Sequence, residues 1–115
     1  MNTVREVLVV LNSSRFGQGN PRLGESLMKE FLRSVLVGDS HPAAILLYNS
    51  AVALACKDSP VLETLKALEE GGCEILVNTE SLEFYSLEEA LEAGKSELLK
   101  PMTERMLHAD LILKP

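Results

Sequence analysis

The stretch that decides the fold is residues 71–81, Gly-Gly-Cys-Glu-Ile-Leu-Val-Asn-Thr-Glu-Ser. Its two glycines are typical of a helix end, the aliphatic run after them is typical of a buried strand, and polar residues follow that strand. In an open α/β sheet, ligands bind at the carboxyl ends of the strands. We therefore expect a binding site at a polar turn formed by Asn78, Thr79, Glu80 and Ser81.

Strand-like segments recur along the rest of the chain. Aliphatic runs at residues 7–11 and 43–48 are typical of strands that are covered on both faces. Residues 74–77 form the third strand of the series. A short strand is expected at residues 95–99, and residues 111–113 form the last one.

Helix signals lie between these strands. Asn20-Pro21 and Ser59-Pro60 each combine an N-cap residue with a proline suited to the first turn of a helix. A capping box at Ser86 predicts a short helix that ends at Gly94, and Pro101 lies near the start of the last helix. The apolar stripe of the first helix should pack on the sheet through Leu23, Leu27, Met28, Phe31, Val35 and Leu36.

Strands that alternate with helices predict right-handed βαβ units. The expected fold is α/β: a single domain over residues 1–115, built as a three-layer α/β/α sandwich around a mostly parallel sheet of about five strands, flavodoxin-like in appearance. The carboxyl ends of parallel strands share one edge of the sheet, here called the rim. Residues after the first two strands should join the Asn78 turn there: Ser13, Ser14, Arg15, Asn49 and Ser50. Leu82, Phe84 and Tyr85 form an apolar patch beside the rim, which either lines a pocket or seats against a neighbouring subunit.

Composition and charge exclude several classes of function. No apolar run approaches the length of a membrane span, and the first residues carry no signal-peptide pattern, so a cytoplasmic protein without membrane attachment is expected. Seventeen acidic residues against eleven basic ones give a net charge of −6, and the basic residues form no cluster in the sequence. Nucleic acid is therefore not an expected partner.

The residues that most often carry chemistry are scarce and scattered. Cys56 and Cys73 lie far apart without metal-ligand spacing, so neither a metal nor another cofactor is expected. Cys73 is expected to be a small packing residue. Cys56 lies on the pocket side of the sheet, where neighbouring Lys57 and the next helix N-terminus could lower its pKa, although packing is the simpler reading of Cys56 as well.

Several motifs, taken in order along the chain, carry a family resemblance. They are residues 9–29, with Asn-Ser-Ser-Arg-Phe-Gly-Gln-Gly at 12–19, residues 47–49, residues 61–69, and the ending at 108–115. Together they resemble the C-terminal domain of the YedF family, the sulfurtransferase-like selenium-metabolism proteins of the DsrE superfamily. The resemblance covers nearly the whole chain. It implies a three-layer α/β/α fold, frequent homo-oligomers, and in active relatives a cysteine after the third strand that carries sulfur as a persulfide.

The chain departs from its relatives at the position of that cysteine. Relatives often have Cys-Gly-Thr-Cys where this sequence has Asn78-Thr79-Glu80-Ser81, so neither thiol is present. They also tend to have glycines after the second-strand asparagine, where this chain has Ser50-Ala51. The small sulfur-carrier domain that commonly precedes this one is expected to be absent, because the first strand begins within ten residues of Met1.

Two hypotheses follow for the function. The first is a non-enzymatic DsrE-like homo-oligomer that binds a small anion or a partner protein at the rim through Asn49, Asn78, Thr79 and Ser81. The second is a sulfurtransferase-like sulfur or selenium relay in which Cys56 accepts a persulfide and a sulfur-carrier protein is the partner.

Overall fold

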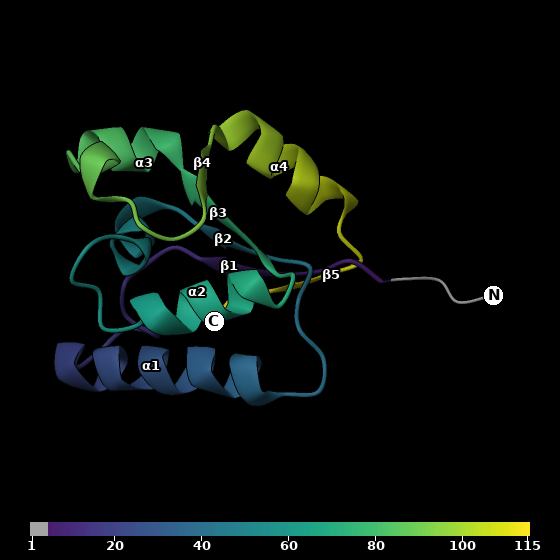
Figure 1. Ribbon diagram of the computed structural model, residues 1–115, viewed down its shortest axis with the longest axis horizontal. Helices are drawn as coiled ribbons and strands as arrows, with labels where there is room; N and C mark the ends of the chain where they lie inside the picture. The colour runs from purple at the N-terminus through teal and green to yellow at the C-terminus, as the bar shows by residue number, and fades with distance from the viewer. Residues whose placement is uncertain (1–4) are drawn as a thin grey trace.

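A five-stranded sheet forms the centre of the computed structural model, which describes residues 5–115 (Figure 1). Its strands are β1 (Val7–Leu11), β2 (Ala44–Leu47), β3 (Glu74–Asn78), β4 (Lys95–Glu97) and β5 (Leu111–Leu113). Their order in the sheet is β4-β3-β2-β1-β5. Every neighbouring pair among these strands is parallel, which confirms the predicted α/β class.

Helices cover both faces of the sheet. They are α1 (Pro21–Val37), α2 (Leu62–Glu70), α3 (Thr79–Phe84) and α4 (Leu99–His108), with short 3-10 helices η1 (Asn49–Ala55) and η2 (Glu88–Ala90). Figure 1 shows α1 and α2 on one face and α4 on the opposite face. Because the strands run toward the left of that view, α3 lies at the rim.

Two apolar clusters, one on each face of the sheet, form the core. The larger cluster joins β1, β2 and β3 to α1, α2 and η1, and it includes Leu32 and Leu65, both fully buried. The smaller cluster lies under α4, where Met102 packs against Leu8 and Val10. Burying this much aliphatic surface is the main stabilising contribution to the fold.

The buried face of α1 differs from the predicted stripe. Leu23 and Leu27 are 57% and 40% exposed, whereas Gly24, Met28 and Leu32 are buried. The helix is rotated because it approaches the β1–α1 loop closely at Gly24, whose carbonyl accepts a hydrogen bond from the Phe16 N–H (3.0 Å). A Cβ at Gly24 would lie only 3.0 Å from the Arg15 Cβ.

Two helix starts differ from the sequence prediction. Ser59 caps a turn rather than the helix: its Oγ accepts a hydrogen bond from the Val61 N–H (3.2 Å), and α2 begins at Leu62. The predicted capping box does not form, because Ser86 has φ 56°, outside the extended conformation of an N-cap residue. Only the short η2 follows it, without a side-chain cap.

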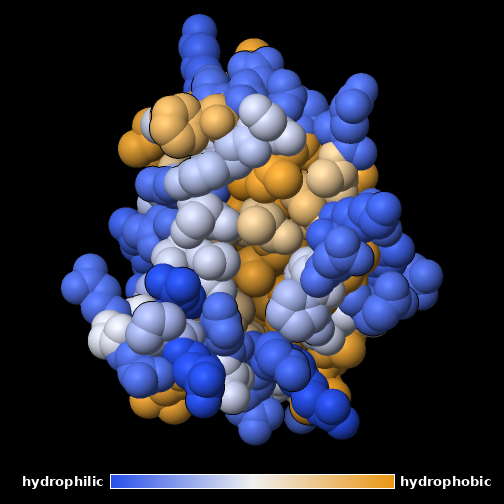
Figure 2. Space-filling model, turned by 90° about the vertical axis from the view of Figure 1, so that its left-hand side faces the viewer, coloured by the Kyte–Doolittle hydropathy of each residue, from blue (hydrophilic) through white to orange (hydrophobic). Residues whose placement is uncertain are grey.

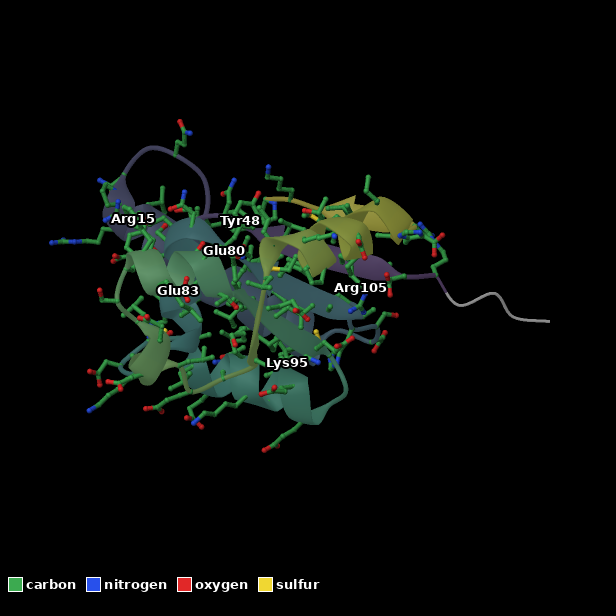
Figure 3. The ribbon with its side chains drawn as sticks, turned by 90° about the horizontal axis from the view of Figure 1, so that it is seen from above. Arg15, Tyr48, Glu80, Glu83, Lys95 and Arg105 are labelled. Atoms are coloured by element: carbon green, nitrogen blue, oxygen red, sulfur yellow. The ribbon has the colours of Figure 1, made fainter. Side chains whose placement is uncertain are left out.

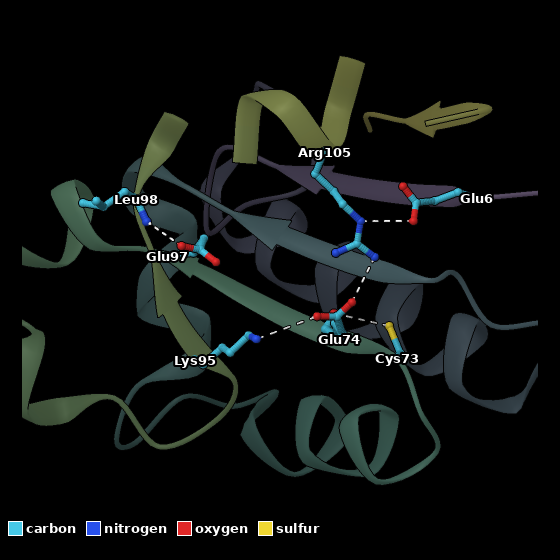
Figure 4. Close-up of polar contacts among 7 residues, drawn as sticks. All are labelled: Glu6, Cys73, Glu74, Lys95, Glu97, Leu98 and Arg105. Atoms are coloured by element: carbon cyan, nitrogen blue, oxygen red, sulfur yellow. Dashed lines mark hydrogen bonds and ion pairs between the residues drawn. The ribbon is translucent and has the colours of Figure 1, made fainter. Parts of the chain in front are cut away.

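An ion-pair network joins three elements at the edge of the sheet opposite the rim (Figure 4). Arg105 on α4 pairs with Glu6 before β1 (3.1 Å) and with Glu74 at the start of β3 (2.9 Å). Burial lowers the pKa of Arg105, but hydrogen bonds to Glu74 and Glu6 outweigh it and raise the pKa. This network fixes α4 on its face of the sheet.

Candidate functional site

Asn78 is the residue around which the predicted site is built. It ends β3 and is the N-cap of α3, since its Oδ1 accepts hydrogen bonds from the Ser81 N–H (2.9 Å) and the Ser81 Oγ (2.6 Å). Its Nδ2 donates to the Glu80 Oε1 (2.7 Å). The expected polar turn is therefore the first turn of a helix, and the buried Asn78 amide is used to hold that helix.

Hydrogen bonds join the ends of the first three strands. The Ser14 N–H after β1 donates to the Ser50 Oγ after β2 (3.1 Å). The Asn49 N–H donates to the Ser81 Oγ (2.7 Å). Asn49 also accepts a hydrogen bond at Oδ1 from the Tyr85 hydroxyl (2.6 Å) and has φ 55°, an uncommon conformation for a residue with a side chain.

A hollow of about 480 Å³ lies over this network, and we call it the Asn78 hollow. Its lining combines polar residues of the network with large apolar side chains: Tyr48, Asn49, Asn78, Glu80, Ser81, Phe84, Tyr85 and Leu99. Figure 2 looks onto the rim and shows hydrophobic surface framed by hydrophilic side chains. In Figure 3, Tyr48 and Glu80 lie toward the rim, and Arg105 lies toward the opposite end.

The remaining predicted residues do not line the Asn78 hollow. Ser13 accepts a hydrogen bond from the Arg15 N–H (3.1 Å), which shapes the loop after β1. Thr79 is the first residue of α3. Ser14 lines a separate hollow of about 560 Å³ between α1 and the segment before α2. Ser14 thus lines a different hollow from Asn49, Asn78, Glu80 and Ser81.

Sequence reasoning found part of the apolar lining. Phe84 and Tyr85 were expected beside the rim and lie there, with their rings in an edge-to-face contact at 5.1 Å. Leu82 of the same predicted patch is instead 2% exposed and packs in the core. Tyr48 and Leu99 were missed, although each is the last residue of a predicted strand and parallel strands end at a common rim.

Glu80 carries the negative charge of the Asn78 hollow. Its own backbone N–H lowers the pKa of the carboxyl group most, and hydrogen bonds from Asn78 and from the Leu99 N–H (3.0 Å) lower it further. The same carboxylate oxygen of Glu80, on α3, thus accepts hydrogen bonds from Asn78 at the end of β3 and from Leu99 at the start of α4. The Glu80 carboxylate therefore links α3 to the first turn of α4.

The stabilising effect of Glu80 should disappear in acid. Because its native pKa is lowered, its contribution is present above the ordinary carboxyl pKa and is lost as the pH falls through the native value. We expect Glu80→Gln to lower the urea midpoint at pH 7 and to match wild type at strongly acid pH. Glu83→Gln, on the same helix, is the control. If Glu80→Gln lowered the urea midpoint equally at both pH values, the charge of Glu80 would not be what links the two helices.

Both cysteines are buried, and their surroundings disfavour the reactive thiolate form. Cys73 is 1% exposed, and burial together with Glu74 and Glu69 raises the pKa of its thiol to about 11. Cys56 is 2% exposed, and its Sγ donates a hydrogen bond to the Val52 carbonyl (3.3 Å). The suggested lowering of the Cys56 pKa is wrong: burial and the nearby Glu92 raise it.

Thiol alkylation should therefore be slow in the native protein. Thiolate is the reacting species, and burial disfavours it at both positions. We expect iodoacetamide at pH 8 to label Cys56 and Cys73 at least about tenfold more slowly than in urea-unfolded chain, measured by mass mapping. Rapid native labelling of Cys56 alone would contradict the burial of this thiol.

The raised pKa of Cys73 also predicts a dependence of stability on pH. Above the ordinary thiol pKa, the unfolded chain loses the Cys73 proton first, so the free energy of unfolding should fall as the pH approaches 11.

Within residues 5–115, no three His, Cys, Asp or Glu side chains are placed to hold a metal ion together. In the same range, no helix has the length and apolar character needed to cross a bilayer.

Comparison with known proteins identifies the fold. No family model matches this chain, and no curated protein matches its sequence. Solved structures do match, among them the YchN protein from E. coli, with 12% identity, a TM-score of 0.67, and coverage of 97% of this chain and 100% of that one. MTH1491 from Methanobacterium thermoautotrophicum, a protein of unknown function, has 13% identity, a TM-score of 0.70 and the same coverage. These neighbours confirm the predicted α/β fold.

Proposed function

We propose that this chain is a non-enzymatic DsrE-like binding protein that assembles with copies of itself through the Asn78 hollow. One observation carries the proposal: polar groups of the hollow hydrogen-bond to one another, while the side chains of Phe84, Tyr85 and Leu99 are exposed. The resemblance to the C-terminal domain of YedF, in which homo-oligomers are frequent, supports a second copy as the occupant.

The absence of a reactive group among the residues lining the hollow supports a non-enzymatic role. Ser81 stands where active relatives have a thiol, and its Oγ already accepts from the Asn49 N–H and donates to the Asn78 Oδ1. A serine nucleophile needs an adjacent base to take its proton, and the hollow contains no histidine or lysine. Its amides and hydroxyls serve to position the strand ends.

The apolar surface of the hollow supports a docking role. Phe84 is 81% exposed, and Tyr85 and Leu99 are 41% and 45% exposed around the same hollow. Aromatic side chains are enriched at protein interfaces because they bury a large area at little entropic cost. The charged side chain in the lining is the Glu80 carboxylate, so protein docking is favoured here over binding of a small anion.

Sedimentation analysis of Phe84→Ser and Leu99→Ser tests the assembly. Wild type should sediment as a species larger than the 12.6 kDa chain, and each substitution should weaken self-association at least about tenfold. Leu107→Ser is the matched control, because Leu107 is 78% exposed on α4 and does not line the hollow. A monomeric wild type, or equal weakening by Leu107→Ser, would refute docking at this surface.

The relay hypothesis is the alternative proposal for the same chain. It requires the Cys56 thiol to reach a persulfide donor, and the 2% exposure of this residue weighs against it. A local opening of η1 would have to precede any transfer. The motifs at residues 9–29 and 108–115, which resemble the C-terminal domain of YedF, support a relation to that family.

A further inference from the structure

A groove between α1 and the chain that leads into α2 lies apart from the Asn78 hollow. It consists of the hollow of about 560 Å³ that includes Ser14 and an adjoining hollow of about 360 Å³. The two hollows share Ser26 and Lys29 on the α1 side and Pro60 and Val61 on the other side. The groove therefore runs along α1 for several turns.

Cationic side chains line this groove in a chain that is otherwise acidic. Arg22, Lys29 and Arg33 are spaced seven and four residues apart, which places them on one face of α1, and Lys57 comes from the opposite wall. None of the ion pairs found among residues 5–115 involves these four residues. Their charges are not neutralised by direct contact with a carboxylate.

Carboxylates also line the groove, but they are in the minority. Glu25, Glu30 and Asp58 accompany the four cations, whereas the whole chain has seventeen acidic residues and eleven basic ones. The local balance of charge is thus reversed relative to the rest of the protein. Because opposite charges raise the local concentration of a charged ligand, the groove favours an anion.

The groove also offers apolar and hydroxyl contacts. Met28, Leu54 and Val61 are 2%, 5% and 2% exposed and line the larger hollow. The side chains of Ser14, Ser26 and Ser59 lie around the same space. A ligand that fits this lining has an apolar part for the buried side chains and a compact anionic group for the cations and hydroxyls.

We propose that this groove binds a small phosphate monoester that carries an apolar group. A phosphate monoester has up to two negative charges and several acceptor oxygens, so more than one cation can hold it at once. Lys57 and the cationic face of α1 approach it from opposite walls, while the apolar group lies against Met28, Leu54 and Val61. This site is separate from the proposed docking surface.

Titration of the intact protein with phenyl phosphate, followed by amide NMR shifts, tests the proposal. We expect saturable shifts at the groove, weaker binding of inorganic phosphate and of benzoate, and loss of affinity as salt is raised. Arg22→Gln combined with Lys29→Gln should raise Kd at least about tenfold. Lys100→Gln combined with Lys114→Gln removes the same charge elsewhere and should leave Kd unchanged.

Four results would overturn the proposal. They are the absence of saturable shifts at millimolar phenyl phosphate, equally tight binding of benzoate, shifts located outside the groove, and an equal loss of affinity in the two double variants. Because Arg22 and Lys29 are exposed, both variants should unfold at the wild-type urea midpoint. The readout is independent of self-association, so a failed docking surface would leave this test intact.

Discussion

Replacing Asn78 with alanine is expected to lower the free energy of unfolding by about 3 kcal/mol. The substitution removes the N-cap of α3 and leaves the Ser81 N–H without its acceptor. It also removes the amide that donates to Glu80, at a position that is only 4% exposed. Urea unfolding followed by circular dichroism measures the loss.

Asn20→Ala is the matched control for this experiment. Asn20 is also an N-cap asparagine, but it is exposed and its side chain accepts a single hydrogen bond, from the Leu23 N–H (3.0 Å). Its removal should cost about 1 kcal/mol, the ordinary value of a cap. Equal effects at the two positions would mean that Asn78 acts only as a cap and does not organise the rim.

Gly94→Ala is expected to cost about 3 kcal/mol or more, because the new methyl group would meet backbone. A Cβ at Gly94 would clash with the Ile75 carbonyl oxygen and would lie 2.8 Å from the Ile75 Cγ2. Gly94 directly precedes β4, so the clash should displace that strand from β3. Thermal or urea unfolding measures the loss, and amide exchange should increase in β4.

Gly17→Ala separates the clash from backbone strain. Gly17 has φ 79°, close to the φ 75° of Gly94, but a Cβ there would meet nothing within 4 Å. It should cost only the strain of a left-handed alanine, about 1–2 kcal/mol. If Gly17→Ala destabilised the protein as much as Gly94→Ala, contact with Ile75 would not be the cause.

Segments with strong periodicity or a plain aliphatic run were predictable from the sequence. The strand at residues 7–11 and the start of α1 at Pro21 lie where expected, and the strand predicted at 74–77 extends by one residue to Asn78. Buried parallel strands are continuous aliphatic runs, and Asn20 does cap the helix. The α3 helix was not predictable in this way. It has six residues with Leu82 as the buried one, so no apolar stripe distinguishes it from a turn.

Details of the rim depend on contacts between distant residues, which local patterns do not encode. The burial of Gly24 follows from its approach to the β1–α1 loop, and an apolar stripe counted from large residues cannot include it. The sequence could not show which rim side chains form hydrogen bonds, because the partners are distant along the chain. Ser81 and Asn49 lie 32 residues apart, and Tyr85 and Asn49 lie 36 apart. The structure shows that the polar groups of Asn49, Asn78 and Ser81 hydrogen-bond to neighbouring residues.

Incubation with a persulfide donor, followed by mass mapping, tests most directly whether the rim is structural rather than reactive. Wild type should gain no sulfur atom at Cys56 or Cys73. Ser81→Cys, which places a thiol where proteins of the YedF family, which the sequence resembles, often have one, should gain one sulfur at position 81. Transfer of one sulfur atom onto Cys56 of the wild-type protein, abolished in Cys56→Ser, would contradict this account and establish a relay.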